Sequence, residues 1–279
     1  MSEAQQYPLG YSEEEARRLA DQGALLEDLT QDVMRRAGLR HAMQVLDIGC
    51  GVGDVSLLAA RMVGSDGSVL GVDKALSSVE AARRRVASLG VKNARFEEGD
   101  LAKFETDQKF DAIVGRLVLL YLPEPARVLR SLLRHLRPDA IVALQEFDMS
   151  QFSQTPASEL FMQTRRWILE AFTAGGAELD MGTKLYTTFL RAGLPAPNMI
   201  AATQVACGPS SAGYQYIAGV LRSLLPLIER SGVANLAEIG IDTLAARLQD
   251  DAVASDRVTF LPRVVGAWAH LSASPGRDD

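Results

Sequence analysis

Three glycines at alternate positions follow an apolar run near residue 50 and could bring the main chain close to a ligand. The run Val45–Ile48 leads into Gly49, Gly51 and Gly53. Because glycine has no Cβ, it adopts left-handed dihedrals and allows close approach to the backbone. Asp73 ends the next apolar run, where a carboxylate can accept hydrogen bonds from two vicinal ribose hydroxyls. Together, the glycines and the acid indicate a site for a nucleoside cofactor.

The spacing of the glycines distinguishes between cofactors. Dinucleotide enzymes use G-x-G-x-x-G, with the third glycine inside the helix, whereas this turn reads G-x-G-x-G and has no pyrophosphate to cradle. The turn resembles the first motif of the class I S-adenosylmethionine-dependent methyltransferases. The small-molecule members that act in ubiquinone and menaquinone biosynthesis are similar. Asp73 matches the ribose-binding acid of that family.

This resemblance runs in order through residues 44–148 and implies a complete cofactor site. It assigns cofactor binding to residues of the turn, of later strand ends and of the amino terminus: Tyr11, Asp47, Gly49, Gly51, Gly53, Asp73, Lys74, Asp100, Leu101, Arg116 and Leu117. In the family, the acid that Asp100 matches accepts from the adenine amino group, and the backbone after the fourth strand faces the methionine portion. The implied cofactor is S-adenosyl-L-methionine, with S-adenosyl-L-homocysteine as the product.

Several of these residues also have a purely structural interpretation. The glycine turn could serve only to pack a strand against a helix. Asp73 could cap the helix that follows it, Asp100 could be a solvated surface acid, and Arg116 could pair with a nearby carboxylate. The ordered series of motifs favours the cofactor site.

Glu146 and Tyr121 are the candidates for contact with a methyl acceptor. Glu146 is expected near the end of the fifth strand, where acceptors lie in this fold, and is predicted to bind the acceptor or take its proton. The alternative is a solvent-facing acid. Tyr121 stands where related enzymes often carry His in an H-L-x-x-P turn, and its phenol could orient an acceptor or simply pack. Because a sulfonium methyl is already activated, alignment can suffice without a base.

Composition limits the partners. The 279-residue chain has a net charge of −6, which argues against nucleic acid because such binding needs clustered Lys and Arg. Its three histidines are scattered, and no paired spacing indicates a metal site. With two cysteines, no signal-like amino terminus and no apolar window of roughly 18 residues, we expect a cytoplasmic protein without a membrane span. A homodimer is one option.

Alternation of β-rich and helical runs predicts an α/β fold. The expected architecture is a Rossmann-like, doubly wound, mostly parallel seven-stranded sheet with helices on both faces. The expected strands are 44–48, 68–72, 94–98, 110–115, 140–147, 198–206 and 257–266, and the expected helices are 54–63, 76–89, 124–136 and 183–192. Ligands bind such sheets beyond the carboxyl ends of the strands, where these motifs fall.

Helical segments are expected to interrupt and flank this core. The expected parts are an N-terminal helical cap (1–42), the cofactor-binding core (43–150), a helical insertion (151–182), core continued (183–207), a second helical insertion (208–256), and the last core strand and tail (257–279). The insertions are predicted to form a lid. Ordinary packing or a dimer face is the alternative.

Three functions are compatible with these observations. The leading hypothesis is a methyltransferase acting on a small, partly apolar molecule, such as a specialised metabolite, at O, N or a carboxylate. The second is a protein of a natural-product pathway that binds the cofactor but catalyses another reaction. The third is a nicotinamide-dependent oxidoreductase, which the glycine spacing disfavours.

Overall fold

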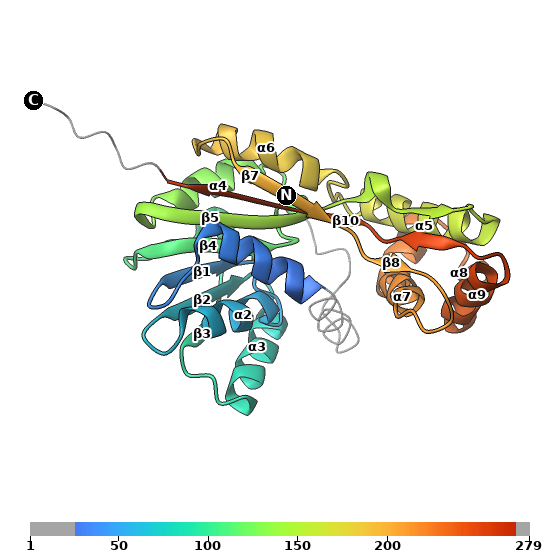
Figure 1. Cartoon of the computed structure of the whole chain (residues 1–279), viewed down its shortest axis with the longest axis horizontal. Coiled ribbons are helices and arrows are strands. Elements are labelled where there is room, and N and C mark those ends of the chain that lie inside the picture. The colour runs from blue at the N-terminus through green and yellow to red at the C-terminus, as the bar shows by residue number, and fades with distance from the viewer. Residues whose placement is uncertain (1–25, 272–279) are drawn as a thin grey trace, which may run out of the picture. The chain divides into compact units, whose positions relative to one another are not determined.

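Residues 26–271 are described by the computed structural model shown in Figure 1, and they fall into two units. The sheet unit comprises, within this range, residues 26–146, 182–200 and 265–271. The helical unit comprises residues 147–181 and 201–264. We describe each unit by itself.

The sheet unit is built on seven strands in the order β3-β2-β1-β4-β5-β10-β7. They are β1 (Gln44–Ile48), β2 (Ser68–Asp73), β3 (Ala94–Glu98), β4 (Phe110–Arg116), β5 (Leu136–Asp148), β7 (Asn198–Ala202) and β10 (Arg263–His270). All pairings among β1 to β5 are parallel. The expected Rossmann-like fold class is therefore confirmed.

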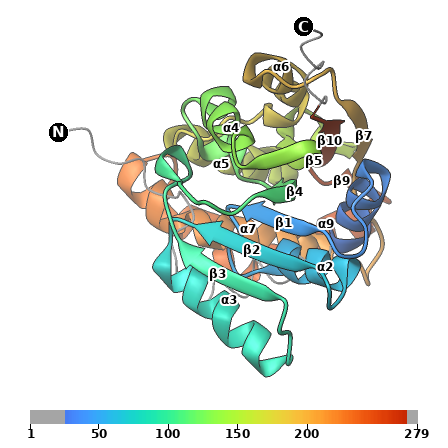
Figure 2. The ribbon, with the colours of Figure 1, turned by 90° about the vertical axis from the view of Figure 1, so that its left-hand side faces the viewer.

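Helices cover both faces of this sheet. They are the helical residues 26–37, α2 (Asp54–Val63), α3 (Leu76–Ser88), α4 (Pro125–Leu133) and α6 (Met181–Ala192). Figure 2 shows α2 and α3 on one face and α4 and α6 on the other. Local sequence explains several ends: Gly38, at φ 90°, ends the first helix, and Pro125 occupies the first turn of α4, where its missing N–H costs no hydrogen bond.

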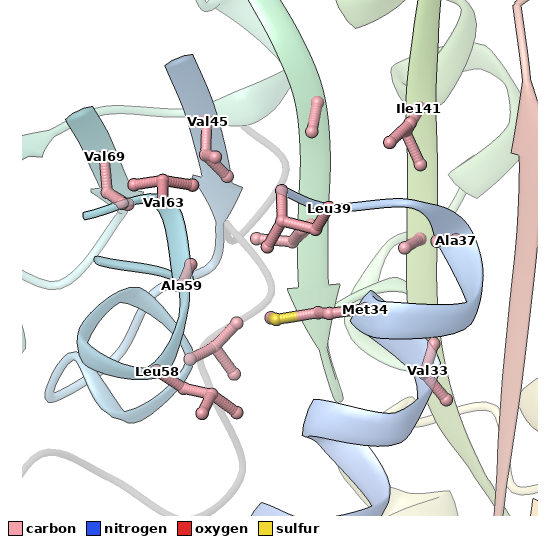
Figure 3. Packing of buried hydrophobic residues seen from close by; sticks show 14 of the residues in the cluster. Val33, Met34, Ala37, Leu39, Val45, Leu58, Ala59, Val63, Val69 and Ile141 are labelled. Atoms are coloured by element: carbon pink, nitrogen blue, oxygen red, sulfur yellow. The ribbon is translucent and has the colours of Figure 1, made fainter. Parts of the chain in front are cut away.

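A buried apolar cluster joins the first helix, α2 and the central strands. Val33, Met34 and Ala37 of the first helix are at most 3% exposed and pack with side chains of α2 such as Leu58. Figure 3 shows the sulfur of Met34 pointing from the first helix toward the α2 side chains such as Leu58. Parallel strands that helices cover on both faces have nearly continuous apolar sequences, and the central strands β1 and β2 follow this rule.

The helical unit has its own small sheet. Its helices are α5 (Glu159–Ala174), α7 (Gly213–Ser231), α8 (Leu236–Ile239) and α9 (Ile241–Ala254), and its antiparallel strands are β6 (Ser153–Thr155), β9 (Val258–Phe260) and β8 (Val205–Ala206), in that order. The apolar stripe of α7, which includes Ile217, Leu221 and Leu224, is buried. The predicted insertions are therefore mostly helical, as expected, but one strand of this small sheet, β6, lies within them, and β8 and β9 lie in segments predicted to belong to the core.

Two predicted strands are wrong in their extent. The run 198–206 is divided into β7 and β8, and the run 257–266 into β9 and β10; in each case the two parts belong to different sheets. Pro262 lies between β9 and β10, and a proline cannot donate to a β ladder. The predicted domain boundaries stay a prediction.

Candidate functional site

The carboxyl ends of the central strands lie at one edge of the sheet. Ile48 of β1 is in register with Val72 of β2 and with Gly115 of β4, and Arg116 is in register with Gln145 of β5. Parallel strands in this register bring the residues that follow them to the same edge. The predicted residues of β1, β2, β4 and β5 therefore gather there.

The glycine loop after β1 has the backbone that its composition predicts. Gly49, Gly51 and Gly53 have φ of 60°, 52° and 88°, in the left-handed region that other residues avoid. A Cβ on Gly49 would lie 2.4 Å from Cγ2 of Val118, so this glycine is required for close packing. A Cβ on Gly51 would meet nothing within 4 Å. The middle of the loop therefore faces open space.

Asp73, at the end of β2, is hydrogen-bonded to the loop. Its Oδ2 accepts from the Gly51 N–H at 2.8 Å, and its Oδ1 accepts from the Ala75 N–H at 2.9 Å, just before α3. The alternative in which Asp73 caps the following helix is wrong, because the N-cap residue of α3 is Ala75, which makes no side-chain capping hydrogen bond; the carboxylate is instead linked directly to the glycine loop. Burial raises the pKa of Asp73, and the backbone N–H groups oppose that rise. The carboxylate and the open loop are adjacent.

Asp47 is fully buried before the loop. Its Oδ2 accepts from the Ser56 hydroxyl at 2.5 Å, whereas its Oδ1 has no hydrogen-bond partner among residues 26–271. Burial raises the pKa of Asp47 to about 7, against the opposing effects of the Ser56 hydrogen bond and the Arg116 charge. A buried carboxylate oxygen without a donor is costly, which favours a cationic or N–H partner from a ligand.

The residues predicted to contact the adenine ring of the cofactor, Asp100 and Leu101, lie after β3. Asp100 is exposed, and its Oδ1 accepts from the Ala102 N–H at 3.0 Å at the start of a short helix, η1 (Leu101–Lys103). Leu101 is 7% exposed and Lys74 is exposed. The exposure of Asp100 agrees with the surface-acid alternative and leaves its carboxylate accessible, so its binding role stays a prediction.

Arg116 and Leu117 end β4. Nη1 of Arg116 donates to the Thr30 hydroxyl at 2.9 Å, and Thr30 in turn donates to the Leu26 carbonyl. Leu117 has φ 59°, a left-handed conformation that is uncommon for residues other than glycine. The chain turns sharply there, at the edge where the glycine loop lies.

Glu146 is 1% exposed, so the alternative of a solvent-facing acid is wrong. Its Oε1 accepts from the N–H groups of Val118 at 3.0 Å and Leu119 at 2.6 Å, and its Oε2 has no partner among the described residues. Burial raises its pKa to about 8, although these N–H bonds lower it. Tyr121 is half-buried at the end of η2 (Leu119–Tyr121). The acceptor roles of both residues stay predictions.

Sequence reasoning missed three neighbours of the site. Ser56 binds Asp47, Thr30 binds Arg116, and Val118 packs on Gly49. None belongs to a motif, and only the fold brings Thr30 to the end of β4. Tyr11 lies outside the described residues. Within residues 26–271, no group of three or more His, Cys, Asp or Glu could hold a metal, and no helix has the length and apolarity needed to cross a membrane.

Comparison with known proteins identifies the part of the chain that carries this site. A family model described as "Methyltransferase domain" matches residues 39–193, more than half of the chain. The chain is 32% identical over 139 residues to the arsenite methyltransferase of Halobacterium salinarum, covering 50% of this chain and 35% of that protein. It is 36% identical over 113 residues to the ubiquinone/menaquinone biosynthesis C-methyltransferase UbiE of Azotobacter vinelandii, covering 40% of this chain and 45% of that protein.

The likeness to solved structures concerns the fold. The YcgJ protein from Bacillus subtilis superposes with a TM-score of 0.61 at 18% identity, covering 88% of this chain and all of that one. The chain thus spans less than half the length of each of the two curated relatives. In contrast, 88% of this chain superposes on the YcgJ protein.

Proposed function

The chain belongs to the methyltransferase-domain family, and on that premise we propose that it moves a methyl group from S-adenosyl-L-methionine to a small molecule by in-line displacement. One observation carries the proposal: the Gly51 N–H donates to Asp73 while the space beside the Gly51 Cα is open. A glycine loop and a carboxylate are thus side by side, as an adenosyl cofactor requires.

The described residues fit this cofactor. The Asp73 carboxylate would hold the ribose hydroxyls, and the open backbone at Gly51 would face the methionine part. The buried Oδ1 of Asp47 lacks a hydrogen-bond donor among residues 26–271, and the cofactor's ammonium group would supply one. Asp100 and Leu101 would contact the adenine. When bound, the cofactor supplies an activated methyl group on a sulfonium.

The contribution of the chain is therefore alignment and exclusion of water. Holding two reactants in an attack geometry can supply several kcal/mol. A carboxylate acceptor carries no proton to be removed, so its methylation needs no base. A hydroxyl, amine or carbon acid would need a proton acceptor. Tyr121, which is half-buried, stays the candidate for that role, since Glu146 is enclosed and engaged with the main chain.

We propose a small acceptor, such as a specialised metabolite. This proposal is supported by the net charge of −6, which disfavours a nucleic-acid substrate. The aromatic residues of the first insertion do not add to it, because Phe152, Phe161 and Trp167 are buried within the helical unit. The cytoplasmic location, the homodimer and the lid stay predictions.

Calorimetry followed by a methyl-transfer assay tests the proposal. The purified chain should bind S-adenosylmethionine and S-adenosylhomocysteine and should not bind NAD⁺. With methyl-labelled cofactor, a panel of carboxylic acids, phenols, amines and carbon acids should include an acceptor that gains the label. Binding of NAD⁺ alone would contradict the assignment. Tight binding of both sulfur nucleosides, with no S-adenosylhomocysteine formed on any acceptor, would favour the hypothesis of a different, cofactor-dependent reaction.

A further inference from the structure

The segment after β4 is anchored to β5 by both backbone and side chain. The Leu117 N–H donates to the Gln145 carbonyl at 2.8 Å, and the next two N–H groups, of Val118 and Leu119, donate to Oε1 of Glu146. These two donors begin the short helix η2, whose first N–H groups have no partner within the helix. Glu146 therefore satisfies groups that would otherwise be buried without an acceptor.

The anchored segment in turn contacts the glycine loop. Val118 is 8% exposed, and its two methyl groups lie so close to the Gly49 Cα that a Cβ on Gly49 would be 2.4 and 2.8 Å from them. Leu117, the residue before Val118, has a left-handed backbone that is uncommon outside glycine, so this conformation persists only because the surrounding contacts hold it. A shift of Val118 would change the support of the loop that begins at Gly49.

We propose that Glu146 is a positioning residue: it holds Val118 and Leu119 so that the Val118 side chain supports the cofactor loop at Gly49. The inference rests on the proposed function, because the loop matters only if it holds the cofactor. It differs from the prediction that Glu146 handles the acceptor. A positioning role requires a fixed hydrogen-bond acceptor at Oε1, whereas a proton-accepting role requires an ionisable group.

The surroundings of Glu146 favour the positioning role. Its Oε1 is occupied by two N–H groups, and its side chain is 1% exposed, so an acceptor molecule would have to displace these contacts or reach Oε2 through the protein. Burial favours the neutral acid, which keeps a carbonyl oxygen for the two N–H groups. A glutamine side chain has the same length and offers the same carbonyl acceptor.

Three variants and one control separate the roles. Glu146→Gln preserves the acceptor, Glu146→Leu removes it, and Val118→Ala removes the packing on Gly49 while the hydrogen bonds stay. Leu144→Ala removes apolar contacts from the same face of β5 and measures the effect of destabilisation alone. For each folded variant, calorimetry measures affinity for S-adenosylhomocysteine, and hydrogen exchange measures protection of the Val118 and Leu119 amides.

We expect Glu146→Gln to keep both amides protected and to bind S-adenosylhomocysteine within about threefold of the wild type, since the acceptor oxygen is retained. Glu146→Leu should lose the protection and bind about tenfold or more weakly, because two buried donors lose their partner. Val118→Ala should weaken binding by about threefold to tenfold through lost packing. Leu144→Ala should lower the melting temperature with affinity within about twofold.

Wild-type affinity in Glu146→Leu or in Val118→Ala would overturn the inference. So would loss of amide protection in Glu146→Gln. If Glu146→Leu does not fold, Val118→Ala and Glu146→Gln still decide between the outcomes. Failure of the wild-type chain to bind S-adenosylhomocysteine would instead refute the proposed function, and the inference with it.

Discussion

Asp73 combines two tasks in one carboxylate. It accepts from the main chain at Gly51 and Ala75, and the space beside the Gly51 Cα is open. We expect Asp73→Ala to weaken S-adenosylmethionine binding by about 1–3 kcal/mol, because a charge-assisted hydrogen-bond pair is lost. Calorimetry measures the change. Glu98 is an exposed acid on β3 that is in register with Asp73 of β2. The variant Glu98→Ala is therefore the matched control and should leave affinity unchanged. Equal affinity in both variants would remove Asp73 from the site.

Glu146 also makes the stability of the unliganded protein depend on pH. Its folded pKa of about 8 lies above the ordinary value of 4.5, so its stabilising contribution is complete below pH 4.5 and is lost as the pH rises through 8. We expect the free energy of unfolding to fall from pH 5 to pH 9, by an amount on the order of a few kcal/mol. Asp47, with a pKa of about 7, acts in the same direction.

Glu146→Gln isolates the first of these contributions. The variant cannot ionise, so it should match the wild type near pH 5 and be more stable at pH 9. Urea unfolding at both pH values measures the difference. If wild type and variant lose the same stability over this range, Glu146 does not carry the effect.

For single residues, the sequence predicted their positions relative to the strand ends better than their burial and their contacts. The motif spacing placed Asp73 next to the glycine loop. For Glu146, the position after an apolar run indicated a strand end, but the alternative of a solvated acid was wrong, because its burial depends on the segment after β4. Contacts such as Arg116 with Thr30, 86 positions apart, carry no local signal.

Among the loops, the one after β1 makes different demands on its first and second glycines. Gly49 is restricted by both its φ and Val118, whereas Gly51 is restricted by its φ alone. Gly49→Ala should lower stability by left-handed strain of roughly 1–2 kcal/mol plus overpacking of about 1–3 kcal/mol. Gly51→Ala should cost only the strain, yet it should strongly weaken cofactor binding, because its methyl group occupies the open space. Thermal melts and calorimetry on both variants measure these effects, and a Gly51→Ala variant with full affinity would contradict this use of the space.

In the helical unit, α7 buries a phenol at some cost. Tyr214 is 1% exposed, and its hydroxyl has no hydrogen-bond partner among the described residues. Tyr214→Phe should therefore raise stability by about 1 kcal/mol, since a buried hydroxyl without a partner is unfavourable. A urea titration checks this. Tyr216→Phe, half-buried in the same helix, is the control and should not raise stability. A loss of stability in Tyr214→Phe would show that the hydroxyl is bonded.

The prediction of helices and strands succeeded where the apolar residues follow a single helical or strand pattern, and it failed where the chain passes from one sheet to the other. The run 94–98 and the helix 54–63 match β3 and α2 residue for residue. The run 198–206 keeps its β-like composition across a change of sheet, so composition alone could not divide it, whereas in the run 257–266 Pro262 marks the division and the prediction passed over it. Hydrogen bonds between Thr203, Gln204 and Leu261 mark that change, and they connect distant parts of the chain.

For the whole molecule, the described residues of the candidate site all belong to the sheet unit. Saturation with S-adenosylhomocysteine at 100 times its Kd should stabilise this unit by about 2.7 kcal/mol. Hydrogen exchange should slow in the loops after β1, β2, β3 and β4, while the amides of α7 and α9 keep their rates. Equal protection in α7 and α9 would contradict a site confined to the sheet unit.

The position of β10 in the sheet sets the order in which that sheet can be completed. β10 follows every other strand in the chain, yet it lies between β5 and β7. As the polypeptide leaves the ribosome, β1 to β5 can associate early, but β7 has no partner strand until β10 emerges. During synthesis, β7 therefore stays unpaired while α7, α8 and α9 are being made. A nascent chain arrested before residue 263 would expose an open sheet edge to chaperones and to other chains.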